Sequence, residues 1–468
     1  MKIGVLGAGS MGIGIAQIAA PFLGPVAGPL AFAAGQAKQK GRINPFALAA
    51  TALPYTKFGG SSSVSPSGTT TDVMHGLTNY ADGVIVAQAD NLYFSLSGTS
   101  YLNINKNTFT AGPGTVSISN NSATVTGTST TFTSSFNLND DIKIDGKVYK
   151  VLSITSNTVL TLDRVADTAS TQNGLSYFIG GISASSLAAA TTINRTSQSN
   201  VKFINFESTG GQNGTIYGVD GANKIFEFFI DDNSKYHFQE LERSSPVGCS
   251  LIERYAERIV VSGQTANPST VFYSTRLKPY DFEGSSAGLI DVGDIVTGIK
   301  VFRNSLIIFC KNSIYELTNL DSTPIIKSVT KNIGCVSGNS IQEIGGDLIF
   351  LAPDGLRTVA GTARIDDVEI GSISRKILPL INNLLTNIQQ FTISSMVIRE
   401  RSQYRLFYHK SGQGQSGQLG IIGTFKFDSN GVPAFEWSET KGMELKFCSS
   451  ELNPFIKEVS SDVKKTKC

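Results

Sequence analysis

Histidine, tryptophan and charged residues are scarce in this 468-residue chain. It holds 3 histidines and 1 tryptophan, and Asp, Glu, Lys and Arg together make up 16% of it. His75, His237 and His409 are too far apart to form a local metal motif, so each is expected to be a surface or packed residue. H-E-x-x-H, G-x-S-x-G and Walker phosphate-binding motifs are also missing. The sequence therefore predicts no catalytic residue, no metal ligand set and no cofactor, and the chain is not expected to be an enzyme.

Cysteine use excludes two common kinds of site. The 5 cysteines are widely spaced and form no C-x-x-C pair, which argues against a zinc ribbon and a thioredoxin-like centre. Cys310 lies in an apolar run and is expected to be a buried thiol. The pattern favours a reduced chain made in a cytosol.

The first 60 residues contain no acid and form an Ala/Gly-rich segment. Gly7, Gly9 and Gly12 match G-x-G-x-x-G after a short apolar run, and this stretch resembles the start of a 3-hydroxyacyl-CoA-dehydrogenase-type nucleotide-binding domain. Pro21 breaks the following helix too early, and the first acid is Asp72, too late to bind a ribose hydroxyl. An NAD-dependent oxidoreductase is therefore the least favoured hypothesis.

Three other roles remain open for this N-terminal segment. Residues 3–37 carry no charge, but glycines and prolines interrupt them, which disfavours a membrane helix. A signal peptide with a cleavage-like triplet at 31–33 is a second alternative. We favour an apolar basic arm over 1–60, buried only when copies of the chain assemble, followed by a Ser/Gly/Thr-rich linker over 61–80.

A strand–turn–strand phrase recurs along the rest of the chain. Its clearest copies are Glu257–Ser274, Asn304–Leu317 and Gly346–Val359, which start 47 and 42 residues apart, and Gly214–Phe229 starts 43 residues before the first. Periods of about 40–45 residues with four short strands each are typical of β-propeller blades. The predicted fold is therefore all-β: a propeller-like disc of about six blades. The predicted blades lie at 81–98, 201–230, 257–275, 297–318, 339–360 and 392–428, with a seventh if the connector 183–198 hides strands.

The repeat is interrupted after its first copy. Residues 107–180 show alternation over several short strands with turns at Asn120-Asn121, Asp140-Asp141 and Asp145-Gly146, which predicts an inserted small β-barrel or sandwich domain. The first blade then spans 81–106, the remaining blades 181–440, and a C-terminal tail 441–468. One helix is predicted at 374–390, with Ser374 as its N-cap and one buried face.

Pairs of acidic residues are the main candidates for binding or catalysis. Paired carboxylates can bind calcium or serve glycoside hydrolysis, but adjacent acids in turns are usually solvated, which is the interpretation we favour here. The pairs are Asp140-Asp141, Asp231-Asp232, Asp291 with Asp294, and Asp366-Asp367.

Four phrases between residues 267 and 378 carry a family resemblance. They are NPSTVFYS (267–274), DVGD (291–294), KNSIY (311–315) and FLAPDG (350–355), with a closing IGSISRKIL (370–378). In these phrases the chain resembles the tail-hub or nozzle proteins of short-tailed phages, including the packaged-DNA stabilisation family. The resemblance covers roughly residues 80–430 and leaves the N-terminal arm outside.

The resemblance implies a structural virion protein, assembled in the bacterial cytoplasm, that forms a ring below the portal and adaptor. Its implied partners are copies of itself, adaptor-side and distal tail proteins, and packaged DNA passing through the lumen, with no membrane partner. Lys38, Lys40 and Arg42, the densest basic cluster without acids, are then the predicted DNA-proximal residues, although a solvated surface run explains them too. The alternative is a surface or secreted propeller that binds or cleaves glycans, which requires a carboxylate pair or arginine cluster on one face of the disc.

Overall fold

A computed structural model of the chain describes most residues from Met74 onward. The described residues are 74–96, 100–166, 168, 170–196, 200–206, 213–241, 245–360, 372–410, 418–427, 433–441 and 447–448. The predicted DNA-proximal residues Lys38, Lys40 and Arg42 and the glycines of the N-terminal motif lie outside them.

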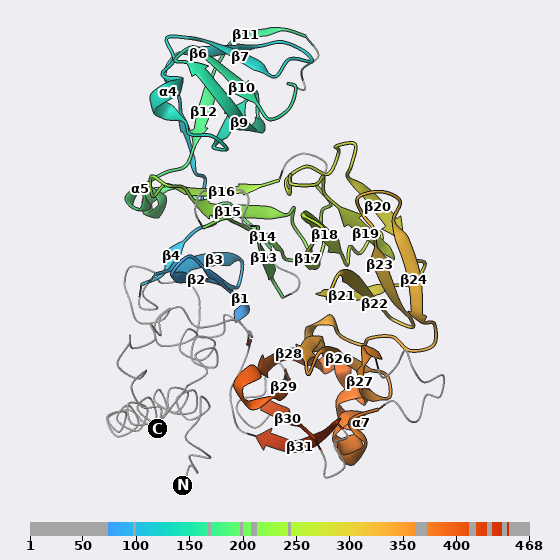
Figure 1. Cartoon of the computed structure of the whole chain (residues 1–468). Helices are drawn as coiled ribbons and strands as arrows, with labels where there is room; N and C mark the ends of the chain where they lie inside the picture. The colour runs from blue at the N-terminus through green and yellow to red at the C-terminus, as the bar shows by residue number, and fades with distance from the viewer. Residues whose placement is uncertain are drawn as a thin grey trace, which may run out of the picture.

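Within these residues the strands form seven antiparallel sheets, six of which stand around a common centre as propeller blades (Figure 1). The all-β prediction with six blades is confirmed. Blade 1 has β1 (Met74–Tyr80), β2 (Gly83–Gln88), β3 (Asn91–Ser95) and β4 (Leu102–Asn103). Blade 2 has β13 (Lys202–Phe206), β14 (Thr215–Val219), β15 (Phe226–Ile230) and β16 (Tyr236–Glu240). Blade 3 has β17 (Leu251–Tyr255), β18 (Arg258–Ser262), β19 (Thr270–Tyr273) and β20 (Gly288–Asp291).

The other three blades follow in chain order. Blade 4 has β21 (Val296–Phe302), β22 (Ser305–Cys310), β23 (Ile314–Thr318) and β24 (Ile325–Thr330). Blade 5 has three described strands, β25 (Gln342–Ile344), β26 (Asp347–Ala352) and β27 (Gly355–Thr358). Blade 6 has β28 (Phe391–Ile398), β29 (Gln403–Lys410), β30 (Gln418–Phe427) and β31 (Pro433–Lys441).

The second strand of each blade is buried on both faces because each blade is covered on both sides. In β22, Leu306, Ile308 and Cys310 pack toward blade 3, whereas Ile307 and Phe309 pack toward blade 5. Successive side chains of a strand point to opposite faces, so a continuous apolar run fits a doubly covered strand. Cys310 is fully buried, as its apolar setting predicts.

Hydrophobic clusters join every neighbouring pair of blades and close the circle. Separate clusters couple blades 1 and 2, 2 and 3, 3 and 4, 4 and 5, and 5 and 6. A sixth couples blade 6 back to blade 1, where Met396 and Phe407 pack with Val84 and Val86. Cys448, in the predicted C-terminal tail, is buried in this closing cluster. Because the clusters form a closed series, each blade is packed on both of its faces.

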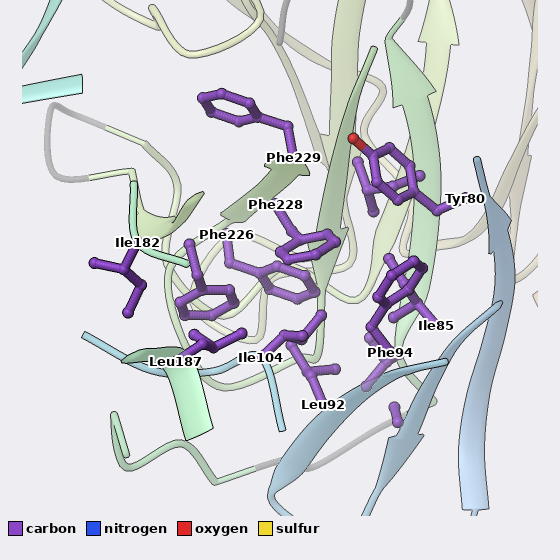
Figure 2. Close-up of a cluster of buried hydrophobic side chains, with 14 residues drawn as sticks. Tyr80, Ile85, Leu92, Phe94, Ile104, Ile182, Leu187, Phe226, Phe228 and Phe229 are labelled. Carbon is purple, nitrogen blue, oxygen red and sulfur yellow. The ribbon is translucent and has the colours of Figure 1, made fainter. Parts of the chain in front are cut away.

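The cluster between blades 1 and 2 is rich in aromatic rings. Figure 2 shows Phe228 between Phe226 and Tyr80, above Leu92 and Phe94. The ring centroid of Phe228 lies 5.4 Å from that of Tyr80, in an edge-to-face arrangement. The Tyr80 hydroxyl donates to the Gly214 carbonyl and accepts from the Ile230 amide, so this ring ties the first strand of blade 1 to blade 2.

The predicted linker boundary needs correction, and the connector adds no seventh blade. Strand β1 lies at Met74–Tyr80, inside the predicted linker 61–80, because Leu77 and Tyr80 supply buried side chains that the composition of that segment did not indicate. The connector 183–198 holds the short helix α5 (Ala184–Ala189), for which the Ser183 hydroxyl accepts from the Ser186 amide. It contributes no strand among its described residues, so the blade count stays at six.

The insert is a strongly curled half-barrel of eight strands with a core of its own. Its strands are β5 (Phe109–Ala111), β6 (Thr115–Ile118), β7 (Thr124–Thr128), β8 (Asp141–Ile144), β9 (Lys147–Ser156), β10 (Val159–Leu162), β11 (Gln172–Leu175) and β12 (Tyr177–Gly180), with α4 (Phe132–Ser135) after β7. The predicted turn at Asp145-Gly146 is present, with both residues at positive φ. The insert stands outside the ring, beyond β16 of blade 2 (Figure 1).

The predicted helix 374–390 is split into three pieces. The 3-10 turns η3 (Arg375–Ile377) and η4 (Ile388–Gln390) flank α7 (Leu378–Thr386), which buries Ile381 and Leu384 against blades 5 and 6. Ser374 is not its N-cap. The Ser374 hydroxyl instead accepts from the Leu356 amide of β27, because the side chain is buried against that strand. Two further 3-10 turns are η2 (Gly338–Ser340) and η5 (Arg399–Arg401).

Candidate functional site

Ionisable side chains are buried where the insert meets blade 2, and we call this place the insert–propeller junction. Asp140 and Asp141 stand at the start of β8, and Lys150 lies in β9 of the same curled sheet. Blade 2 contributes side chains from its two outer strands and from the turn between them. The junction residues are Asp140, Asp141, Lys150, Glu227, Asp231, His237 and Gln239, and all are buried.

Lys150 joins the two parts of the chain. Its Nζ lies 2.6 Å from Asp141 Oδ1 of the insert and 2.5 Å from Glu227 Oε1 of β15. The Gln239 amide nitrogen donates to the same two carboxylates. The ammonium also lies 4.9 Å from the centre of the Phe229 ring. A buried ammonium with two carboxylates and an aromatic face is well compensated, which explains how this lysine can be buried.

His237 lies on the other side of Asp141. Its Nε2 is 3.3 Å from Asp231 Oδ2, and its Nδ1 is 3.6 Å from Asp141 Oδ2, too far for a hydrogen bond. The imidazole stacks on Phe229, with ring centroids 4.1 Å apart. Gly181 packs against its edge at φ +91°, and a Cβ there would come within 2.4 Å of His237 Nε2, so only glycine leaves room for this ring.

The turns around the junction orient its carboxylates. Asp140 Oδ2 accepts from the Asn137 amide at 2.7 Å, which closes the turn before β8. Asp231 Oδ1 accepts from the amides of Asn233 and Lys235 in the turn between β15 and β16. Each carboxylate keeps its second oxygen for other partners.

Burial and nearby opposite charges shift the pKa values of the paired junction residues in opposite directions. Burial alone would raise the pKa of Asp141, but Lys150 and His237 together outweigh it and lower that pKa. Burial would lower the pKa of Lys150, but Asp141 and Glu227 outweigh it and raise that pKa. Asp140 lacks such a cation, and its burial raises the pKa of its carboxyl group. The charged form of the Lys150–Asp141 pair is therefore the stable one.

A second candidate site is a groove between the turns of blades 3 and 4, on one face of the disc. Its volume is 470 Å³, and Arg254, Tyr255, Arg303 and Asp321 are among its lining residues. Two further arginines pair with Asp321: Arg258 at 3.2 Å and Arg276 at 3.8 Å. Arg254 pairs with Glu257, another lining residue, at 3.1 Å, and Tyr255 is only 9% exposed, so the groove presents guanidinium and carboxylate groups together.

The structure separates the predicted acid pairs into two kinds. Asp140, Asp141 and Asp231 are brought together and buried, so the expectation that these acids are solvated is wrong. The folded junction supplies lysine, histidine and backbone partners from distant parts of the chain, which the sequence does not reveal. Asp291 and Asp294 cap turns instead: Asp291 accepts from the Gly293 amide, and Asp294 accepts from Asn312 and Ser313. Asp366-Asp367 lies outside the described residues.

The sequence predicts His237 to be a surface or packed residue, and it does not single out Lys150 or Glu227 as site residues. Glu227 carried a signal, because it is the charged residue inside the apolar run Ile225–Ile230, and its side chain is fully buried. Lys150 lies in β9 between Tyr149 and Val151, which pack into the core of the insert, so its own side chain points to the other face of the strand, toward blade 2. A charge inside a doubly covered strand indicates a buried partner.

A separate buried ion pair ties the chain leaving the insert to blade 2. Arg195 Nη2 lies 2.6 Å from Asp220 Oδ2, and Nη1 contacts Glu240. Burial would raise the pKa of Asp220, but Arg195 and the Asn223 amide lower it below its usual value.

This pair predicts a pH dependence of stability. Because the folded pKa of Asp220 is depressed, its contribution to the free energy of unfolding is full above the unfolded pKa of about 3.9 and is lost as the pH falls through the folded value. We expect the Asp220→Asn variant to be less stable than the native chain at pH 7 and the difference to shrink below pH 4. Urea denaturation between pH 7 and pH 3 measures it. A difference that stays constant with pH would contradict the assignment.

Among the described residues, no helix has the length and apolar character needed to cross a membrane. A scan against protein-family models finds no match, and a comparison with curated protein sequences finds none either.

Comparison with solved structures finds propeller proteins at low similarity. The Kluyveromyces lactis protein Hsv2p has 10% identity and a TM-score of 0.30, covering 78% of this chain and 99% of that one. PorZ, a surface component of the type-IX secretion system of Porphyromonas gingivalis, has 12% identity and a TM-score of 0.30, covering 78% and 64%. The phage phi92 endosialidase has 11% identity and a TM-score of 0.24, and the match spans 61% of this chain and about half, 53%, of that one. At such TM-scores these similarities carry no argument about this chain.

Proposed function

We propose that this chain is a structural subunit of a phage tail hub or nozzle, which assembles as a ring and surrounds the DNA channel below the portal and adaptor. The observation that carries the proposal is the position of the family-like phrases. They fall on β19, on the turn after β20, on the turn into β23 and on β26 with the turn after it. The resembling segment therefore builds three consecutive blades of the disc, not a loop added to it.

Three further features support a structural role. The hydrophobic clusters between all neighbouring blades make the disc stiff, which suits a component of a larger assembly. The described acid pairs also have structural partners, in the junction or as turn caps, and are not paired across an open cleft. Exposed apolar residues on the outer strands of blades 3 and 4, Leu289, Ile325 and Ile326, suit contact with neighbouring subunits.

The groove between blades 3 and 4 favours a second candidate function, the binding of acidic glycans. An arginine cluster on one face of the disc is the feature that this alternative requires. Arg254 and Arg303 line the groove, and arginines suit sugars that carry carboxylates.

Particle imaging with analytical ultracentrifugation of the purified full chain separates the two candidates. We expect closed rings with an open channel, and ring formation unchanged in the Arg254→Ala/Arg303→Ala variant. A stable monomer that binds acidic glycans on an array, with binding lost in that variant, would reject the tail proposal in favour of the glycan-binding one.

A further inference from the structure

The insert–propeller junction contains more buried negative charge than its own cations neutralise. Its carboxylates number four, against one ammonium and one imidazole, so an excess of acid remains even when the imidazole is protonated. The groups counted are Asp140, Asp141, Asp231 and Glu227 against Lys150 and His237. Buried charge without a counter-charge is strongly unfavourable, so the junction has the composition of a cation site.

Three of these groups lie close together. Ligand atoms of Asp140, Asp231 and His237 all lie within 4.8 Å of one another, and the three residues are buried. His237 is 1% exposed. Its Nε2 lies 3.3 Å from Asp231 Oδ2, and its Nδ1, which has no hydrogen-bond partner, faces Asp141 Oδ2 at 3.6 Å. One ion placed among the three is within reach of all of them after small side-chain rotations.

We propose that Asp140, Asp231 and His237 bind one divalent transition-metal ion, which fastens the insert to blade 2. One imidazole with two carboxylates is a ligand set that suits Zn²⁺ or Mn²⁺, whereas Ca²⁺ favours oxygen ligands alone. Asp140 comes from the insert and the other two from blade 2, so the ion bridges the two parts of the chain. The site is independent of the proposed tail function, because it concerns how the insert is held.

Zinc titration tests the site directly. The full chain is stripped with EDTA, dialysed and titrated with ZnCl₂ by calorimetry, with thermal unfolding measured in parallel. We expect one equivalent of Zn²⁺ to bind and the melting temperature to rise by about 3–5 °C, because the ion binds the folded state alone. CaCl₂ at the same concentration is expected to leave the melting temperature unchanged.

Variants test the ligands. His237→Gln and Asp231→Asn are expected to lose zinc binding, while Asp232→Asn, at the exposed neighbouring position, keeps it. Co²⁺ in place of Zn²⁺ should give visible absorption bands in the native chain that are lost in His237→Gln. No zinc binding by the native chain, or equal binding by the native chain and both ligand variants, would overturn the proposal.

Asp140→Asn keeps the test decisive if a ligand variant does not fold. Removing one of the crowded carboxylates relieves repulsion in the stripped protein, so its metal-free melting temperature should equal or exceed that of the native chain. Its response to Zn²⁺ should be lost. If Asp140 has only a structural role, the Asp140→Asn variant should instead have a lower metal-free melting temperature than the native chain and an unchanged response to Zn²⁺.

Discussion

Replacing Lys150 by methionine should destabilise the protein by about 3–5 kcal/mol, since a buried ion pair that loses one partner leaves the other charge uncompensated. Lys150 contacts both Asp141 and Glu227, so two carboxylates are affected. Methionine fills nearly the same volume and isolates the effect of charge. Urea denaturation followed by circular dichroism, in EDTA to exclude bound metal, measures the change in the free energy of unfolding.

Two controls identify the cause of that loss. Lys426→Met removes an exposed pair with Glu436 and should change stability by less than about 1 kcal/mol. Combining Lys150→Met with Asp141→Asn and Glu227→Gln removes the orphaned charges and should recover most of the stability. If the triple variant is as unstable as Lys150→Met alone, charge compensation is not what the lysine provides.

Truncating Phe228 to alanine should cost about 3–5 kcal/mol, the range for deleting a large side chain from a packed core. The ring is fully buried between blades 1 and 2 (Figure 2). It contacts Tyr80 and Phe94 at centroid distances of 5.4 and 5.8 Å. Thermal and urea unfolding measure the loss.

Trp437 gives this test a remote reporter. It is the single tryptophan of the chain and lies in blade 6, where its indole nitrogen donates to the Ile373 carbonyl. If the closed circle of clusters unfolds as one unit, the Phe228→Ala variant shifts the fluorescence transition of Trp437 by as much as the circular dichroism transition. Phe178→Ala, on the insert and 39% exposed, is the matched control and should have little effect. Transitions that separate in Phe228→Ala would show that the blades unfold independently.

The propeller could be predicted from sequence because its signal is local and repeated. Runs such as Ser305–Cys310 and Asp347–Ala352 mark the second strand of a blade, and turns with residues at positive φ, such as Arg303 before β22, follow each innermost strand. Strand β1 was missed because Met74–Tyr80 mixes polar and apolar residues, and its burial depends on blade 2 and blade 6.

The junction could not be predicted in the same way because its partners are distant in sequence. Asp141 meets Gln239 across 98 positions, and Lys150 meets Glu227 across 77. An acid pair beside a turn looks solvated until the surface that covers it is known. Glu227 is the clearest local signal, because a charged residue within an apolar run predicts a buried polar partner for that strand.

The two ends of the insert lie side by side. Phe109 of β5 pairs with Gly180 of β12, so the chain leaves the propeller between blades 1 and 2 and returns to it at nearly the same point. The insert also has a hydrophobic core separate from the six clusters of the disc. A single gain or loss of this segment would therefore leave the order and closure of the blades intact. Evolution can exchange this segment as a unit, provided that the face of blade 2 that the insert covers, with Glu227 and His237, changes together with it.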